Sequence, residues 1–516
     1  MRNLKQLLDK NKMKIFNVVA IIVISIFAIS ISPKGLQNDT FYTVTIGELI
    51  TQNGIDMKDH FSWNQDLPYT YPHWLYDVGM YYIYNLWNWD GIYISTCILA
   101  IILGLCIYGT NSKLSKNKII SFFITIGSLY LLKDFIAARA QLVTFILFIL
   151  EIFCIERYLE NRKFKYAVFL VIIQTLIANL HSAVWPFSFI LYLPYIAEYI
   201  ISEIIRFIKK KAKIECKNEE PYKLEIKRNT NVRWLILVMV ITGFTGLITP
   251  LGFTPYNYTY LTMEGNTMKS INEHLPLTLI ENIPVLCALL VVLVILIFTK
   301  TKIRLSDLFM IGGLTYLMFM TRRQSSMFAL IGSVVLTRLI VNYLEIYGYK
   351  KFVNDFFVFI LITVFSVSIL GYSFDKIRKK QNANYISEST YPVQAAEWIL
   401  ENLDVNNIKL YNEYNYGSYL LYKGIPVFID SRADLYAPEF NTNTDDPKDG
   451  RDIFSDFINV SSIGTYYGEI FEKYGITHAL MYGNSKMNML IKKADSEKYK
   501  LIYSDDNFVL YEILNY

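Results

Sequence analysis

The chain has 516 residues, of which 53% are hydrophobic, and its mean hydropathy is +0.29. This apolar share exceeds the roughly 45–50% of soluble domains, and the apolar residues stand in long blocks, which argues against a soluble protein. The net charge of +5 gives no reason to expect a nucleic-acid partner. The five cysteines lack the spacing of metal or redox motifs, and none lies in the long loops or the C-terminal region expected outside the cell, so we expect no disulfide framework there.

The first apolar run, Ile15 to Ile31, follows a basic N-terminal segment. It is similar to a signal peptide, but Pro33 follows the small-residue site at Ser30 to Ser32 and would hinder cleavage. We therefore predict an uncleaved anchor. Its basic flank places the N-terminus in the cytoplasm.

Ten further apolar runs predict transmembrane helices near residues 91–109, 119–133, 140–155, 166–180, 182–201, 234–249, 283–299, 305–321, 324–343 and 353–371. Lys and Arg gather in every second connection, and basic loops are retained on the cytoplasmic side. About eleven spans satisfy this rule. The rule places the basic loop 202–233 inside, and it places the loops 32–90 and 250–282 and the tail after Gly371 outside.

The segment from Trp74 to Trp89 fits this count poorly as a span. It is short, rich in Tyr and Trp, and interrupted by Asp77, Asn85 and Asn88. A crossing here would place the loop 202–233 outside. We predict an interfacial or re-entrant helix with aromatic side chains at the level of the headgroups; a genuine span is the alternative.

The tail changes character. Strand-like pieces at 409–411, 427–429, 479–481, 501–503 and 508–511 alternate with helix-like pieces at 392–400 and 465–473. This alternation predicts a small α/β domain. The expected organisation is a polytopic α-helical membrane domain over 1–371 and an extracytoplasmic α/β domain over 372–516.

Asp39, just after the first span, is the candidate catalytic residue. A carboxylate at the membrane face can act as a general base that removes a proton from an acceptor hydroxyl as the hydroxyl attacks a sugar. The alternative is that Asp39 caps a helix over 41–50. The same loop ends in Tyr71-Pro72-His73-Trp74, where Tyr71 and His73 are candidates for substrate contact.

Arginines on the predicted outer side run against the charge bias and need an explanation. Arg139 and the pair Arg322 and Arg323 are candidates for binding a donor phosphate, because guanidinium groups suit phosphate oxygens. Contact with lipid headgroups, or pairing of Arg139 with Asp134, is the alternative.

Three further polar residues on that side are substrate-binding candidates. His181 ends a span, and Glu273 and His274 lie in the outer loop 250–282. The alternative for His181 is a histidine whose hydrogen bonds are satisfied within the protein. The alternative for Glu273 and His274 is that they cap a surface helix.

Together these features resemble the GT-C superfamily of multi-span glycosyltransferases, in a largely uncharacterised bacterial branch. The resemblance extends over nearly the whole chain and rests on the acidic first loop with Asp39, Tyr71-Pro72-His73-Trp74, Ala138-Arg139-Ala140-Gln141, Asn179-Leu180-His181, Thr249-Pro250-Leu251-Gly252, Arg322-Arg323, Tyr411-Asn412-Glu413-Tyr414 and Phe428-Ile429-Asp430-Ser431-Arg432-Ala433-Asp434.

The resemblance implies a sugar transferase in the cell membrane that uses a polyprenyl-phosphate-linked sugar and an extracytoplasmic acceptor. Asp39 would correspond to the catalytic carboxylate, and Arg139 and Arg322 or Arg323 would bind the donor phosphate. Tyr414, Asp430, Arg432 and Asp434 would cover the site or select the acceptor, or else support the fold. Metal use varies in the superfamily, so a divalent cation stays open as a cofactor, although no ligand set is recognised.

Two other classes of function stay open at this point. A flippase or transporter of lipid-linked glycans would carry ionisable residues inside the bundle, and the spans are poor in such residues. A non-catalytic envelope scaffold is the other class.

Overall fold

The computed structural model describes residues 2–212, 223–265, 267–280, 282–348, 355–442 and 450–514. The chain forms two compact units, and both are assembled from segments that are separate in sequence. The first unit, called here the bundle, comprises 1–33, 93–249 and 272–382. The second, called here the outer unit after its predicted location, comprises 34–92, 250–271 and 383–516.

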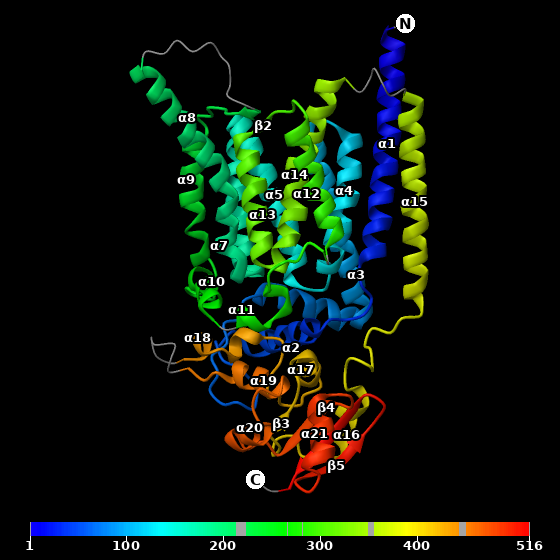
Figure 1. The fold of residues 1–516 in the computed structure, drawn as a ribbon, viewed down its shortest axis with the longest axis vertical. Coiled ribbons are helices and arrows are strands. Elements are labelled where there is room, and N and C mark those ends of the chain that lie inside the picture. The colour runs from blue at the N-terminus through cyan, green and yellow to red at the C-terminus, as the bar shows by residue number, and fades with distance from the viewer. Residues whose placement is uncertain are drawn as a thin grey trace. The chain divides into compact units, whose positions relative to one another are not determined.

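Long helices that lie side by side make up the bundle (Figure 1). They are α1 (Arg2–Ile31), the second half of α3 (Trp74–Ser115), α4 (Lys118–Leu132), α5 (Ala140–Asn161), α6 (Phe164–Leu180), α8 (Leu193–Ala212), α9 (Val232–Thr242), α12 (Ile283–Phe298), α13 (Leu305–Met320), α14 (Ser325–Tyr347) and α15 (Asp355–Gln381), with the short α7 (Trp185–Ser188) between α6 and α8.

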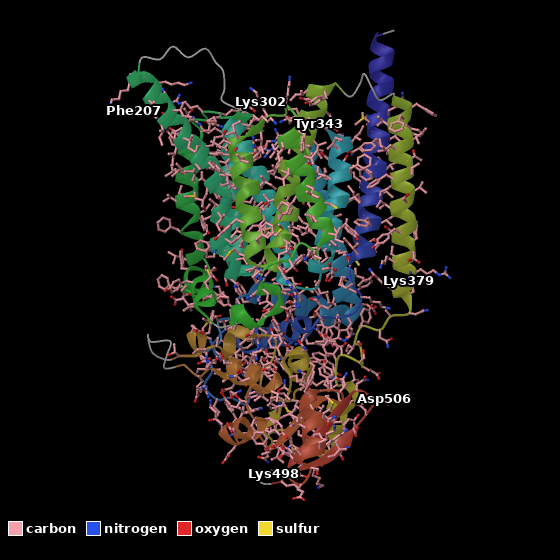
Figure 2. The ribbon with its side chains drawn as sticks, in the orientation of Figure 1. Phe207, Lys302, Tyr343, Lys379, Lys498 and Asp506 are labelled. Atoms are coloured by element: carbon pink, nitrogen blue, oxygen red, sulfur yellow. The ribbon has the colours of Figure 1, made fainter. Side chains whose placement is uncertain are left out.

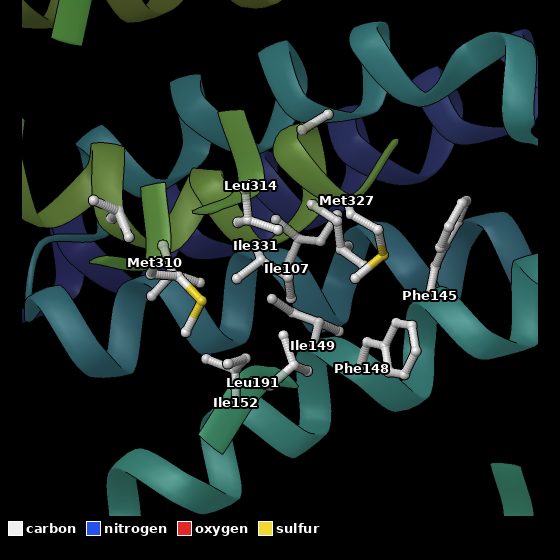
Figure 3. Packing of buried hydrophobic residues seen from close by; sticks show 14 of the residues in the cluster. Ile107, Phe145, Phe148, Ile149, Ile152, Leu191, Met310, Leu314, Met327 and Ile331 are labelled. Atoms are coloured by element: carbon white, nitrogen blue, oxygen red, sulfur yellow. The ribbon is translucent and has the colours of Figure 1, made fainter. Parts of the chain in front are cut away.

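Branched and aromatic side chains fill the interior of the bundle. Ile107 of α3, Ile149 of α5, Leu314 of α13 and Ile331 of α14 are at most 3% exposed and meet in one cluster (Figure 3). The outward faces are also apolar; Phe298 of α12, for example, is 79% exposed. A helix that is apolar all round suits a lipid surrounding. The inward apolar side chains form the core, and the outward ones are suited to contact with lipid.

Most predicted spans coincide with one helix among the described residues, but 182–201 is divided among short helical turns, α7 and the start of α8, and 234–249 extends beyond α9, which ends at Thr242. Five helical segments are long and apolar enough to cross a membrane, namely Lys12–Ile31, Trp74–Ser115, Ser182–Lys211, Arg322–Tyr347 and Phe356–Gln381. Shorter apolar helices, such as α12 and α13, accompany them. The chain is therefore an integral membrane protein with several spanning helices.

The basic connections of the bundle gather at one of its ends. Strand β1 (Leu224–Glu225) of the loop 202–233 pairs in parallel with β2 (Ile303–Arg304) of the next basic loop. Figure 2 shows Phe207, Lys302 and Tyr343 at this end. Loops that were predicted to share the cytoplasmic face thus lie together. The predicted inside positions of Lys213, Lys217, Lys350 and Lys351 fall outside the described residues.

Helix α3 is broken between its two halves. Trp87 and Asn88 have non-helical backbone angles, and Asn88 has a φ of 50°. Residues up to Ile92 belong to the outer unit and residues from Tyr93 onward to the bundle. The break falls near the end of Trp74–Trp89, shortly before the predicted span 91–109. An interfacial position for the first half remains a prediction.

The outer unit holds a four-stranded mixed sheet in the order β3-β4-β6-β5, with β3 and β4 parallel and the other pairs antiparallel. Its elements are α2 (Asn38–Asn53), the first half of α3, α10 (Thr254–Glu264), α11 (Thr267–Ser270), α16 (Val393–Asn402), β3 (Leu410–Tyr411), α17 (Tyr414–Tyr422), α18 (Pro438–Asn441), α19 (Ile453–Ser461), α20 (Tyr467–Tyr474), β4 (His478–Tyr482), α21 (Lys486–Ala494), β5 (Tyr499–Ser504) and β6 (Phe508–Ile513).

Most tail pieces match these elements, but 427–429 does not form a strand of the sheet. Val427 instead makes an isolated bridge to Ser62 of the first outer loop. The backbone groups of Val427 are hydrogen-bonded to the first outer loop and not to the sheet. The sequence of the tail alone could not show this. The predicted domain boundary at 371–372 remains a prediction; within the structure the change of unit follows Asn382.

Candidate functional site

Arg139 marks the end of the bundle that lies opposite its basic loops. It immediately precedes α5, whereas Arg157 lies near the other end of this 22-residue helix, which is about 33 Å long. Nη1 of Arg139 lies 3.2 Å from Oε1 of Glu273 in the turn 272–274. Two of the residues singled out from the sequence are therefore ion-paired here.

The second arginine pair lies in the turn Arg322–Gln324, which joins α13 to α14. Nη1 of Arg322 donates to Oδ1 of Asn272 at 2.8 Å, and the Arg322 N–H donates to the carbonyl of Leu275 at 2.8 Å. These bonds join the turn 322–324 to the turn that carries Glu273. Arg139, Glu273 and Arg322 consequently belong to one cluster.

The charge balance of this cluster is positive. Burial opposes ionisation of Glu273, but the charges of Arg139 and then of Arg323 outweigh it, so the pKa of this carboxyl lies below its ordinary value. The guanidinium groups of Arg139 and Arg323 thus act on one carboxylate, and that of Arg322 is bonded to the neighbouring Asn272. The amino end of α5 adds the positive end of the helix dipole. Such an arrangement is suited to binding a phosphate.

His181 lies beside the first turn of α5. Its Nδ1 lies 2.9 Å from Oγ1 of Thr144, which in turn donates to the carbonyl of Ala140. His181 is 3% exposed and hydrogen-bonded within the protein. This agrees with the alternative to substrate binding, a buried histidine whose hydrogen bonds are satisfied. His274 follows Glu273 in the same turn of the cluster.

Asp39 lies in the first turn of α2 in the outer unit. The helix begins at Asn38, earlier than the expected 41–50, and its N-cap is Gln37. Asp39 is therefore not the cap residue, although the helix dipole favours a negative charge at this position. The neighbouring Asn38 donates from Nδ2 to the carbonyl of Tyr414, the first residue of α17, at 2.8 Å. The start of α2, which carries Asp39, therefore lies beside the start of α17, which carries Tyr414.

Tyr71 is fully buried and holds the first outer loop together. Its hydroxyl donates to Oδ1 of Asp56 at 3.0 Å and to the carbonyl of Lys58 at 2.9 Å. Its φ of 46° is unusual for an aromatic residue. His73 lies just before α3, and its carbonyl accepts the N–H of Asp77. Tyr71 therefore shapes the loop.

Asp430 and Arg432 are ion-paired in the interior of the outer unit. Nη2 of Arg432 lies 2.7 Å from Oδ2 of Asp430, and the two side chains are 3% and 0% exposed. Asp434 accepts hydrogen bonds from the hydroxyls of Tyr258 at 2.7 Å and of Thr267 at 3.3 Å. It joins the segment 250–271 to the tail. These contacts favour the fold-supporting interpretation of Asp430 and Arg432.

Sequence reasoning missed charged residues inside the bundle. Glu151 of α5 is fully buried, and its Oε1 accepts a hydrogen bond from Nε2 of Gln174 at 2.6 Å. One turn further on, Glu156 is paired with Arg304 at 2.6 Å and Arg338 at 2.8 Å. A signal was present, since both glutamates interrupt an otherwise apolar stretch of α5. In the part of the chain that the structure describes, no group of three His, Cys, Asp or Glu could hold a metal ion.

No family model matches the chain, and no protein of curated function matches its sequence. Solved structures do match. The oligosaccharyltransferase of Archaeoglobus fulgidus, tethered to an acceptor peptide, has a TM-score of 0.56 at 11% identity, over 97% of this chain and 74% of that one. AglB of the same organism, in complex with an inhibitory peptide and dolichol phosphate, has a TM-score of 0.52 at 11% identity, over 91% and 69%.

A third match is ArnT of Cupriavidus metallidurans bound to undecaprenyl phosphate, with a TM-score of 0.49 at 10% identity, over 97% of this chain and 98% of that one. At these identities the likeness concerns the fold alone. The chain has a fold like that of the archaeal oligosaccharyltransferases.

Proposed function

We propose that the chain is a membrane glycosyltransferase that moves a sugar from a polyprenyl-phosphate donor to an acceptor on the outer side of the cell membrane. The observation that carries the proposal is the cluster in which Arg139 and Arg323 act on Glu273 and Arg322 is bonded to the neighbouring Asn272. An excess of guanidinium groups at a helix amino end suits a diphosphate or phosphate group at the membrane surface.

In the proposed mechanism the acceptor hydroxyl attacks the anomeric carbon of the sugar while the bond from that carbon to the phosphate oxygen breaks. Asp39 takes the proton of the hydroxyl as general base. The lipid phosphate leaves with the bonding electron pair, and the arginine cluster stabilises its charge. The donor sugar and the chemical class of the acceptor are left open.

Asp39→Asn tests the base, because the amide keeps the shape of the side chain but cannot accept the proton. We expect turnover to fall about 10²- to 10⁴-fold in membranes reconstituted with the lipid-linked donor. Asp66→Asn is the matched control, since Asp66 is exposed in the same loop. Full turnover by Asp39→Asn would remove Asp39 from the mechanism.

The arginine cluster predicts a different effect. Arg322→Gln should raise the KM for the lipid-linked donor more than it lowers kcat, because the donor phosphate is bound before the reaction. Arg157→Gln, at the other end of α5, is its control. An unchanged KM in Arg322→Gln would argue against donor binding by the cluster.

A transporter of lipid-linked glycans is the second candidate, and the buried Glu151 favours it, because an ionisable group inside a bundle often marks a transport pathway. Mass spectrometry of the lipid-linked sugars that accumulate on deletion separates the two candidates. Donor that accumulates on the outer leaflet with the glycan addition missing supports transfer. Donor trapped on the inner leaflet supports transport.

A further inference from the structure

A buried ion cluster in the outer unit joins two segments that are far apart in sequence. Arg432 lies between two carboxylates: its Nη1 is 2.5 Å from Oδ1 of Asp59, and its Nη2 is 2.7 Å from Oδ2 of Asp430. The three side chains are 3%, 1% and 0% exposed, respectively. Buried charges of this kind persist only when paired and hydrogen-bonded.

Each guanidinium nitrogen of Arg432 has a partner, since Nε also donates to Oδ1 of Asp430 at 2.9 Å. The flat group stands over the rings of Phe61 and Tyr69, with 5.4 Å and 5.0 Å between Cζ and the ring centroids. Tyr436 donates to Oδ2 of Asp430 at 2.6 Å. A planar five-donor group is needed to satisfy this geometry, which a lysine ammonium cannot reproduce.

Beside the cluster, the first outer loop is bonded directly to the tail. The N–H of Val427 donates to the carbonyl of Phe61 at 3.1 Å, and the N–H of Trp63 donates to the carbonyl of Val427 at 3.2 Å. Nδ2 of Asn64 donates to the carbonyl of Phe428 at 2.9 Å. The ring of Trp63 stacks on that of Phe428. Backbone, side-chain and ring contacts thus attach the loop to residues 427 and 428 of the tail.

Helix α2, which carries Asp39, lies between two attachments to the tail. At its start, Asn38 is bonded to the carbonyl of Tyr414, and the ring of Phe41 packs against Tyr419 with 5.2 Å between centroids. After its end at Asn53, the chain reaches Asp59 and the cluster. The direction of α2 therefore depends on both attachments.

We propose that Asp59 and Arg432 are positioning residues that fix the first outer loop to the tail and thereby set the direction in which α2 presents Asp39. This assignment rests on the proposed function. It differs from a role of Arg432 in acceptor binding, because the guanidinium is enclosed and fully occupied by protein groups.

Asp59→Asn is the variant of choice, because it removes one charge without changing the shape of the side chain and leaves the pair of Arg432 and Asp430 in place. We expect amide hydrogen exchange over residues 54–70 to rise at least tenfold. We also expect kcat to fall about tenfold while the KM for the lipid-linked donor stays unchanged. Arg432→Lys should behave similarly, and Arg432→Met should lose more activity than Arg432→Lys.

Arg451→Ala is the matched control. Its guanidinium also bonds the loop, at the carbonyl of Gln65, but from an exposed position. It should leave both kcat and the exchange of the loop near the values of the unmodified chain.

Unchanged exchange over 54–70 in Asp59→Asn, or a rise in KM at constant kcat, would overturn the positioning role. Hydrogen exchange needs no substrate, so it tests this role even if Asp39→Asn shows that the proposed transferase mechanism is wrong. If the Arg432 variants do not fold, Asp59→Asn decides alone.

Discussion

Glu413 is the residue at which the outer unit should respond most clearly to pH. It precedes α17, and burial raises the pKa of Glu413 to about 7 from an ordinary 4.5, while a hydrogen bond with the backbone of Tyr482 acts in the opposite sense. A carboxyl whose pKa is raised on folding binds its proton more tightly in the folded state. Its contribution to stability is therefore complete below pH 4.5 and is lost as the pH rises through about 7.

We predict that the unmodified chain loses about 2 to 3 kcal/mol of stability relative to Glu413→Gln between pH 4.5 and pH 8. Thermal unfolding of both proteins in detergent across this range measures the difference. Glu401→Gln, at an exposed position of α16, is the control. A difference in melting temperature that does not change with pH would contradict the prediction.

At the residue scale, the sequence singled out Arg139, Arg322 and Glu273 of the cluster in the bundle, but it did not indicate the pairing of Asp59 with Arg432 in the outer unit. Arg139 and Arg322 stood out because basic residues are unusual on the predicted outer side. Successive helices run in alternating directions, so the connections on that side meet at one end of the bundle. Asp59 and Arg432 are separated by 373 positions, and no local pattern connects them. Only the fold of the outer unit does so.

Among the elements of the bundle, four helical segments are joined by one network of buried charges. Glu156 of α5 and Asp307 of α13 alternate with Arg304, which precedes α13, and Arg338 of α14. The hydroxyl of Tyr195 of α8 donates to Oε1 of Glu156 at 2.8 Å. Two positive and two negative charges satisfy one another, so removal of one charge leaves another uncompensated.

We predict that Arg338→Met destabilises the bundle by about 3 kcal/mol, the lower end for a broken buried pair, because Arg304 still contacts both carboxylates. Unfolding in mixed micelles measures this loss. Arg157→Met should cost less than about 1 kcal/mol, since its partner Glu160 is exposed. Equal losses in the two variants would show that the network contributes no more than a surface pair.

The elements themselves follow closely from the apolar pattern of the sequence. The break in α3 falls at Trp87 and Asn88, near the end of Trp74–Trp89 and shortly before the predicted span 91–109. Charged residues at the ends of spans were harder to interpret. Arg304 lies in a basic connection and Arg338 within a predicted span, and sequence spacing does not show that both contact Glu156.

In the molecule as a whole, each compact unit consists of three separate segments of the chain, which the sequence did not predict. Gly47 of α2 shows how closely the first loop is built into the outer unit, because an added Cβ would lie 2.1 Å from the carbonyl oxygen of Asp77 in α3. Only glycine permits so close an approach of two helices. The first loop, the segment 250–271 and the tail share one apolar core, and this sharing could not be read from the sequence.

The sidedness of the chain is the largest prediction that follows from its charges. The basic loops lie at one end of the bundle, and retention of Lys and Arg in the cytoplasm places that end inside. An odd number of spans then places the tail outside. In a cysteine-free background, a membrane-impermeant maleimide should label Lys498→Cys in intact cells and Lys302→Cys only after permeabilisation; both positions are exposed (Figure 2). Labelling of Lys498→Cys only after permeabilisation would place the tail in the cytoplasm. Asp39 would then have no access to an extracytoplasmic acceptor, because it belongs to the same compact unit as the tail.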